Sequence, residues 1–351
     1  MKVNPKQLII AREYRGYSQT ELAKEIEGLS QSNLSKYEKG IDILSDEILL
    51  RIIDFLKFPA NFFSKKILNF SENVNYRKRA SMTKNERTKI DLTCRLIGYV
   101  VDEMANELEY PDFTLRMIDL EEGYTPTYIA QYIRKLLGIE EGPVKDINQT
   151  LEKSGIIIVE FNFDTSLFDG ISFMSDNGYP IIIINKSCSN DRKRFNIAHE
   201  LGHLIMHTAI DNLYPEHRNK ELEANMFASE FLMPESEIKN SLVNLKMVDT
   251  VELKRYWLTS MSSIIMRAKD LGGISQDRYK YLNIELSRNG FKRKEPINVY
   301  IDSPKIFMTA YKMYRDELGY SMNDLSDAFC LPIDVLNKLF DDSGTRLRIL
   351  I

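Results

Sequence analysis

The chain has 351 residues, of which 43% are hydrophobic and 28% are charged, so it can build two or three compact domains, and neither a disordered chain nor a fibrous one is expected. The formal net charge of −4 excludes a protein that is basic throughout, although a local basic patch stays open. Three scattered cysteines, Cys94, Cys188 and Cys330, exclude a disulfide framework or a cysteine-based zinc site.

Five short helices are predicted within residues 1–64. Gly16 ends the first amphipathic segment, as glycine often does just after a helix. The next helix begins with a serine that is followed three residues later by Glu21, which is the spacing of a capping box. Serines open three of these helices: Ser18, Ser30 and Ser45. We therefore expect a small helical bundle.

The stretch SQTELAKEIEGLSQSNLSKYEKG resembles the XRE (Cro/repressor-like) helix-turn-helix family. The resemblance implies that the second helix crosses the DNA backbone, where Gln19 would contact a phosphate, and that the third helix enters the major groove. Glutamine and asparagine can pair with adenine edges there. The candidate residues of the third helix are Gln31, Ser32, Asn33, Ser35 and Lys36. A helical bundle used for protein contacts is the alternative.

A basic connection follows the bundle. Between Lys65 and Arg95 there are nine lysines or arginines and three acidic residues. Apolar residues at helical spacing predict a long helix over 83–109, and two shorter helices are predicted over 126–137 and 144–153.

The hydrophobic period then changes from helix to strand. Strands are predicted over 156–160, 170–174 and 180–185, with a turn signal between the last two. A helix containing the histidines comes directly after this small mixed sheet, and another is expected over roughly 219–232. Residues 235–285 are predicted to be mainly helical, 296–301 to be a strand, and 304–340 to hold short helices.

All four histidines lie between His199 and His217, and two of them belong to the sequence His199-Glu200-Leu201-Gly202-His203. On a helix, residues i and i+4 share a face, so His199 and His203 can point two imidazoles at one Zn²⁺ ion. Glu200 would lie beside that ion without binding it and could take a proton from water. A surface helix with a chance match is the alternative, and the apolar flanks argue against it.

A third ligand must come from elsewhere in the chain. The segment ELEANMFASEFLMP offers Glu223 as the first choice, with Glu230 and then Glu221 as alternatives. Glu223 and Glu230 are seven residues apart and can share a helical face, so the sequence leaves the choice open. His207 lies two turns beyond His199, and we expect it to support a ligand or to bind substrate.

The two segments RFNIAHELGHLIMH and ELEANMFASEFLMP together resemble the ImmA/IrrE-type zinc metallopeptidases over roughly residues 145–285. The resemblance implies His199 and His203 as zinc ligands, Glu200 as catalytic base and Glu223 as third ligand. It also implies a gluzincin-like fold and proteolysis of a repressor-type protein.

The sequence thus predicts an α+β, mostly helical chain. Four parts are expected: a five-helix DNA-binding bundle over 1–64, a basic linker and helical connector over 65–140, a zincin domain with a small mixed sheet over 141–288, and a small C-terminal segment over 289–351.

The favoured interpretation is a DNA-binding transcriptional regulator fused to a zinc metalloendopeptidase, active or latent until signalled. The expected partners are a double-stranded operator, a repressor or antitoxin as substrate, and a second copy of the chain in a homodimer. The alternative is a regulator or antitoxin whose zincin domain is structural or sensory. The chain shows no apolar run of signal-peptide or membrane-span length, which favours a cytoplasmic protein.

Overall fold

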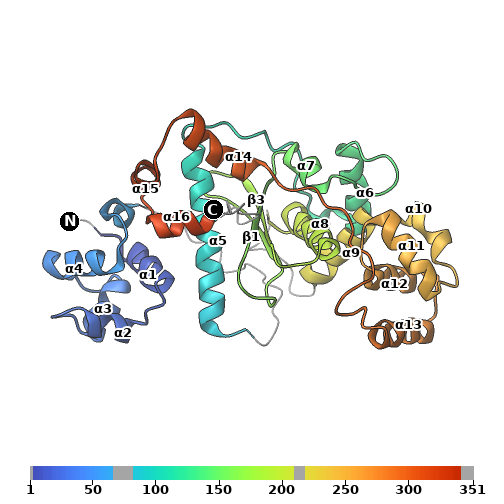
Figure 1. Ribbon diagram of the computed structural model, residues 1–351, viewed down its shortest axis with the longest axis horizontal. Coiled ribbons are helices and arrows are strands. Elements are labelled where there is room, and N and C mark those ends of the chain that lie inside the picture. The colour runs from blue at the N-terminus through green and yellow to red at the C-terminus, as the bar shows by residue number, and fades with distance from the viewer. Residues whose placement is uncertain (1–2, 66–81, 209–217, 341–351) are drawn as a thin grey trace, which may run out of the picture. The chain divides into compact units, whose positions relative to one another are not determined.

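The computed structural model describes residues 3–65, 82–208 and 218–340 (Figure 1). Residues 66–81, which hold most of the predicted basic linker, and residues 209–217, which include His217, lie outside the described residues. The chain divides into two compact units. Unit 1 takes its described residues from 1–69, 81–108 and 307–351, and unit 2 takes them from 109–306. The domain limits inferred from sequence stay predictions.

The N-terminal part of unit 1 is the helix-turn-helix region. Its elements are α1 (Pro5–Tyr14), α2 (Gln19–Glu25), α3 (Gln31–Glu38), α4 (Asp46–Leu56) and the 3-10 helix η1 (Ala60–Ser64). The expected capping box is present at α2, where the Glu21 N–H donates to Ser18 Oγ and the Ser18 N–H donates to the Glu21 carboxylate. Leu22 and Leu34 are fully buried, which packs α2 and α3 together.

Unit 1 also contains later parts of the chain. These are α5 (Lys84–Met104), α14 (Ile306–Lys312), the π-helix η5 (Met313–Glu317), α15 (Met322–Phe329) and α16 (Ile333–Leu339). The Tyr99 hydroxyl donates to the carbonyl of Phe329, and the Tyr314 hydroxyl donates to the carbonyl of Met104. Arg15, at the end of α1, forms an ion pair with Asp334 on α16. Segments from both ends of the sequence therefore build one unit.

Unit 2 is built around a small mixed sheet. Its strands are β1 (Ile157–Phe161), β2 (Gly170–Met174) and β3 (Pro180–Asn185), arranged in the order β1-β3-β2. β1 runs parallel to β3, with Ile157 opposite Ile181, and β2 runs antiparallel to β3. The central strand β3 is buried along its whole length, as its run of isoleucines predicts.

The other described elements of unit 2 are helices. They are η2 (Leu120–Glu122), α6 (Pro126–Leu136), α7 (Ile147–Glu152), α8 (Asn190–Met206), α9 (Lys220–Leu232), α10 (Glu235–Ile238), η4 (Lys239–Leu242), α11 (Met247–Trp257), α12 (Met261–Asp270) and α13 (Gln276–Arg288). Of these helices, α7 and α8 contact the sheet directly. α8 packs against β2 and β3 on one side and against α9 on the other. A mostly helical chain with a three-stranded mixed sheet and an N-terminal helix-turn-helix region confirms the predicted fold class. None of the described helices is both long and apolar enough to cross a membrane.

The predicted strand over 296–301 is wrong, because the structure has no strand in this segment. Side chains hold it in place instead of a backbone ladder. The Asn190 amide donates to the carbonyl of Val299. The Asp302 carboxylate accepts from the N–H groups of Asn148 and Gln149 at the start of α7. The apolar residues of 296–301 therefore belong to a segment that is held against unit 2 by hydrogen bonds to side chains. The described residues supply no strand partner for it.

Candidate functional site

The candidate site lies on α8, which carries His199, Glu200 and His203 in its C-terminal half. The neighbouring apolar residues of the helix, including Ile197, Leu201 and Leu204, are completely buried in the core of unit 2. Gly202 permits the close packing of α8 on α9, because a Cβ atom there would lie 3.1 Å from the ring of Phe227. The core thus fixes which face of α8 the histidines occupy.

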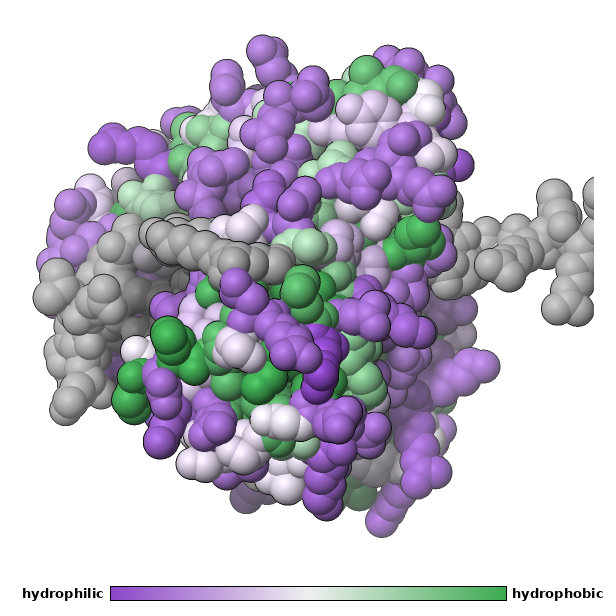
Figure 2. All heavy atoms as spheres, turned by 90° about the vertical axis from the view of Figure 1, so that its left-hand side faces the viewer, coloured by the Kyte–Doolittle hydropathy of each residue, from purple (hydrophilic) through white to green (hydrophobic). Residues whose placement is uncertain are grey.

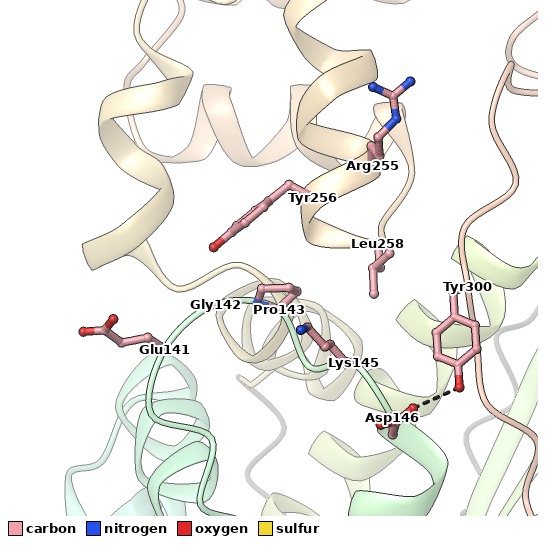
Figure 3. A pocket seen from close by; sticks show the side chains of 9 residues that line it. All are labelled: Glu141, Gly142, Pro143, Lys145, Asp146, Arg255, Tyr256, Leu258 and Tyr300. Carbon is pink, nitrogen blue, oxygen red and sulfur yellow. Dashed lines mark hydrogen bonds between the residues drawn. The ribbon is translucent and has the colours of Figure 1, made fainter.

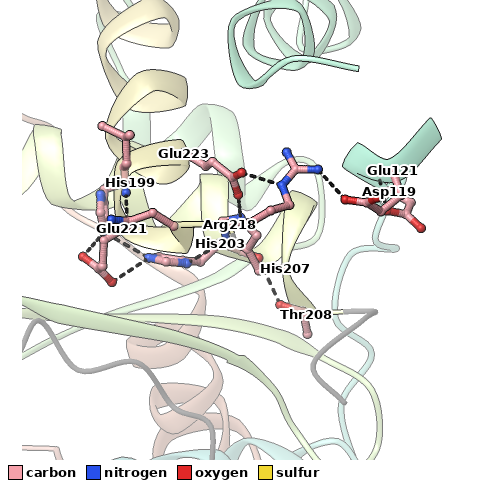
Figure 4. A network of polar contacts seen from close by, with 11 residues as sticks. Asp119, Glu121, His199, His203, His207, Thr208, Arg218, Glu221 and Glu223 are labelled. Atoms are coloured by element: carbon pink, nitrogen blue, oxygen red, sulfur yellow. Dashed lines mark hydrogen bonds and ion pairs between the residues drawn. The ribbon is translucent and has the colours of Figure 1, made fainter. Parts of the chain in front are cut away.

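Three side chains converge at this face (Figure 4). The Nε2 atoms of His199 and His203 are 3.1 Å apart. The two carboxylate oxygens of Glu221 lie 3.5 Å from His199 Nε2 and 3.3 Å from His203 Nε2. Ligand atoms about 2.0–2.1 Å from a tetrahedral zinc ion are about 3.3 Å apart. Each nearest-atom distance is therefore close to the spacing of zinc ligands, and one ligand atom from each of the three residues lies within 4.8 Å of the others.

The residue beside the histidines is Glu221, not Glu223, which was the first choice from sequence. Both lie in the first turn of α9, two residues apart, so their side chains leave the helix in different directions. Burial opposes ionisation of Glu221, but hydrogen bonds to His199 and His203 outweigh it and hold the pKa of Glu221 well below its usual 4.5. An anionic Glu221 thus faces the two imidazoles.

Glu223 and Glu230 are engaged elsewhere. The Glu223 carboxylate accepts from His207 Nε2 at 3.0 Å and from Arg218 Nε at 2.7 Å. Glu230 is completely buried, pairs with Arg267 and also accepts from the Gln131 amide. Each carboxylate is compensated by a cation, which buried carboxylates require.

Both candidate ligand histidines have a partner on the ring nitrogen that faces away from Glu221. His199 Nδ1 lies 3.1 Å from Asn225 Oδ1, which can only accept, so His199 Nδ1 carries the proton. His203 Nδ1 lies 2.9 Å from His207 Nδ1. Such partners fix the orientation of metal-binding imidazoles.

His207 ends α8 and is buried between His203 and Glu223. Burial and the neighbouring His203 lower the pKa of His207 to about 3, so its ring is neutral near pH 7. Because its Nε2 donates to a carboxylate, its Nδ1 is left to accept from His203. This places His207 in contact with a candidate ligand, on the side away from Glu221.

Glu200 is held from the sheet. The hydroxyl of Ser172, on β2, donates to its carboxylate at 2.8 Å. Gly170, two residues earlier, keeps β2 close to β3, because a Cβ atom there would lie 2.8 Å from Ile184 Cδ1. Only 9% of Glu200 is exposed. The carboxylate is thus fixed next to His199 in sequence and oriented by a residue of the neighbouring strand.

Sequence reasoning missed Ser172, Asn225 and Arg218. Asn225 had a usable signal, because it follows Glu221 by four residues and so shares its face of α9, as His203 follows His199 on α8. Ser172 and Arg218 had none, since only the tertiary fold brings them to the site.

Two cavities in unit 2 are lined by other residues. One of about 670 Å³ lies between the 141–146 segment, the end of α11 and Tyr300 (Figure 3). Its wall combines Lys145 and Arg255 with Glu141 and Tyr256, and the Tyr300 hydroxyl donates to Asp146. The other, of about 240 Å³, is lined by Arg116 and three tyrosines, Tyr124, Tyr128 and Tyr132, among others.

The candidate DNA-contacting residues lie on α2 and α3. The exposed side chains of α2 and α3 are mainly hydrophilic. The face drawn in Figure 2 shows hydrophilic side chains with hydrophobic ones among them. Gln31 Nε2 donates to Gln19 Oε1 at 2.9 Å, and Gln19 Nε2 donates to Glu38, which also accepts from Arg12. Gln31, Ser32, Asn33 and Lys36 are exposed, and Gln19 and Ser35 are half-buried. The buried Arg12–Glu38 pair thus orients Gln19, which in turn holds Gln31.

Comparison with known families agrees with this division. Residues 8–63 match the helix-turn-helix family. Residues 151–269, which contain the sheet, α8 and α9, match the IrrE N-terminal-like domain of the M78 peptidases. No curated protein matches the chain. From N- to C-terminus, the chain therefore carries an XRE-type helix-turn-helix domain followed by an IrrE/ImmA-like M78 peptidase domain.

Proposed function

We propose that the chain is a zinc-dependent endopeptidase in which His199, His203 and Glu221 hold the metal. The observation that carries this proposal is the spacing of the three side chains. Their nearest ligand atoms lie 3.1 to 3.5 Å apart, close to the spacing of ligand atoms around tetrahedral zinc. The donor chemistry agrees, since two neutral imidazoles and one carboxylate are a common set in catalytic zinc sites with an open fourth position.

Bound zinc would supply a water of lowered pKa and polarise the scissile carbonyl. Glu200 would act as general base, taking the proton of the attacking water and passing it to the leaving nitrogen. The Ser172 hydroxyl would keep the Glu200 carboxylate turned toward that position. Asn225 would hold the His199 ring with its Nε2 lone pair toward the metal.

We further propose that the helix-turn-helix domain directs this activity to a regulatory circuit. α3 would enter the major groove of an operator, as a homodimer on a two-fold symmetric site. The protein substrate would be a repressor or an antitoxin that acts in the same circuit. The joining of a DNA-binding domain and a peptidase domain in one chain supports this proposal.

Elemental analysis of the purified protein tests the zinc site. We expect about one zinc per chain in the wild type and a large loss in both His203→Ala and Glu221→Ala, because each variant removes one of three protein ligands. Glu252→Gln is the matched control, since that side chain is 68% exposed and far along the chain from α8 and α9. Wild-type protein that stays zinc-free after incubation with zinc would contradict the proposal.

Binding to a duplex selected from a random pool tests the DNA-reading residues. We expect Asn33→Ala and Gln31→Ala to weaken binding to the selected duplex by roughly 5- to 150-fold each, the worth of about 1–3 kcal/mol for a bidentate base contact. Binding to an unrelated duplex should change little, because it depends on phosphate contacts. Equal weakening on both duplexes would show that these residues do not read bases.

A further inference from the structure

A continuous line of polar contacts leads from the candidate metal position to the surface of unit 2 (Figure 4). His203 Nδ1 lies 2.9 Å from His207 Nδ1, and His207 Nε2 lies 3.0 Å from a Glu223 oxygen. The other Glu223 oxygen accepts from Arg218 Nε at 2.7 Å. Arg218 Nη1 then donates to Glu121, also at 2.7 Å. Four successive contacts thus connect the candidate ligand His203 to Glu121 of η2.

From His207 outward, burial falls steadily along this line. Only 3% of the His207 side chain and 12% of the Glu223 side chain are exposed, against 18% for Arg218 and 50% for Glu121. A buried carboxylate that lost its partners would be costly, so Arg218 and His207 together hold Glu223 in one place. The inner contacts are therefore the fixed ones, and the outer ion pair is solvated.

The donors and acceptors of the inner contacts can be ordered in only one way. A carboxylate accepts and cannot donate, so His207 Nε2 carries the hydrogen. A neutral imidazole has one donor and one acceptor, so His207 Nδ1 accepts. His203 Nδ1 must then donate, so the ring would bind the metal through its other nitrogen, Nε2, which faces Glu221 in this structure.

We infer that Glu223 is a positioning residue, which acts through His207 to set the tautomer and ring orientation of His203. The inference rests on the proposed zinc site. Asn225 does the same for His199 by direct contact. His199 is thus oriented by a residue of α9, and His203 by His207 at the end of α8. Glu221 and Glu223 lie in the same turn of α9 but have different roles. Glu221 faces the proposed metal position, and Glu223 faces away from it.

The decisive variant is Glu223→Gln, which keeps the shape of the side chain but adds a donor. A glutamine amide can donate to His207 Nε2, and this reverses every later contact, placing the hydrogen of His203 on Nε2. We expect zinc affinity, measured by chelator competition, to fall roughly 10- to 100-fold, as for other partners of metal-binding histidines. The d–d spectrum of the cobalt-loaded protein should change with it. Glu122→Gln, an exposed neighbour of Glu121, is the matched control and should behave as wild type.

Nitrogen NMR of histidine-labelled, zinc-free protein gives a readout that needs no metal. We expect His207 to carry its hydrogen on Nε2 in the wild type and to populate the Nδ1–H form in Glu223→Gln. Unchanged tautomer and unchanged zinc affinity in that variant would overturn the inference. So would a loss of zinc as complete as in His203→Ala, because Glu223 would then be a ligand. A wild type that binds no zinc would instead contradict the proposed function, while the tautomer measurement would still decide the positioning role.

Discussion

Glu200→Gln is expected to lower the rate of peptide-bond hydrolysis by roughly 10²–10⁴-fold, the usual contribution of a general base. Glutamine can still accept the hydrogen bond from the Ser172 hydroxyl, so the side chain should stay in place. It cannot take a proton from water. Zinc content should stay at the wild-type level, because Glu200 is not one of the three clustered side chains. The measurement is kcat/KM on an unfolded reporter protein, with zinc analysis of the same sample.

The comparison that gives this result its meaning is with His203→Ala. Both variants should be inactive, but only His203→Ala should lack zinc. A Glu200→Gln protein that is as active as the wild type would remove Glu200 from the mechanism. If neither the wild type nor any variant cleaves the reporter while zinc is bound, the metal would instead support a sensing or structural domain.

Lys254→Met is expected to lower the free energy of unfolding by about 3–5 kcal/mol, the cost of breaking a buried ion pair from one side. The Lys254 ammonium is 1% exposed and lies 2.8 Å from Asp191 on α8 and 2.6 Å from Glu295. Methionine fills similar space but leaves both carboxylates without their cation. The measurement is urea denaturation followed by circular dichroism. It should be read with zinc absent, so that metal binding does not shift the transition.

The matched control is the triple variant Lys254→Met, Asp191→Asn, Glu295→Gln, which should recover part of the loss because no unpaired charge is left. The dependence on pH adds a second check. Burial raises the pKa of Asp191, but hydrogen bonds from Lys254 and Ser189 outweigh it, so the pKa lies below its ordinary 3.8. The stability gained from Asp191 is therefore present above that value and is lost as the pH falls through the folded-state pKa. Without Lys254 we expect this loss to begin at a higher pH.

Local signals predicted the fold best. The capping box at Ser18 and Glu21 and the serine N-caps act between neighbouring residues, so they can be recognised without tertiary contacts. The run of isoleucines from 181 to 184 likewise needs only its own length and β-branching to indicate a buried strand. The 296–301 segment is also rich in apolar residues, but the described part of the chain offers it no strand to pair with, and no property of the segment itself could reveal that.

The site divides in the same way. The two histidines four residues apart define their own face, so the sequence was sufficient to place them together. On α9 the usual pattern is reversed: Leu222 and Met226 are exposed at 56% and 42%, while Glu223 and Glu230 are buried. The apolar stripe of Ala224, Phe227, Ala228 and Phe231 marks the face of α9 that meets α8, but it does not reveal that Glu223 and Glu230 are buried as well. The cations that make this reversal possible, Arg218 and Arg267, come from outside α9.

The make-up of unit 1 has a consequence for synthesis of the protein on the ribosome. The hydrogen bond between Tyr99 and Phe329 joins residues 230 positions apart. At roughly 5–20 residues per second, the second partner is made roughly 10–50 s after the first. During that interval α5 lacks its hydrogen bond with α15 and the helix-turn-helix lacks its ion pair with α16, while the residues of unit 2 are being made. Translation order therefore delays the finished unit 1 until unit 2 has been made, so a chain interrupted soon after residue 306 would hold a full-length unit 2 beside an incomplete unit 1.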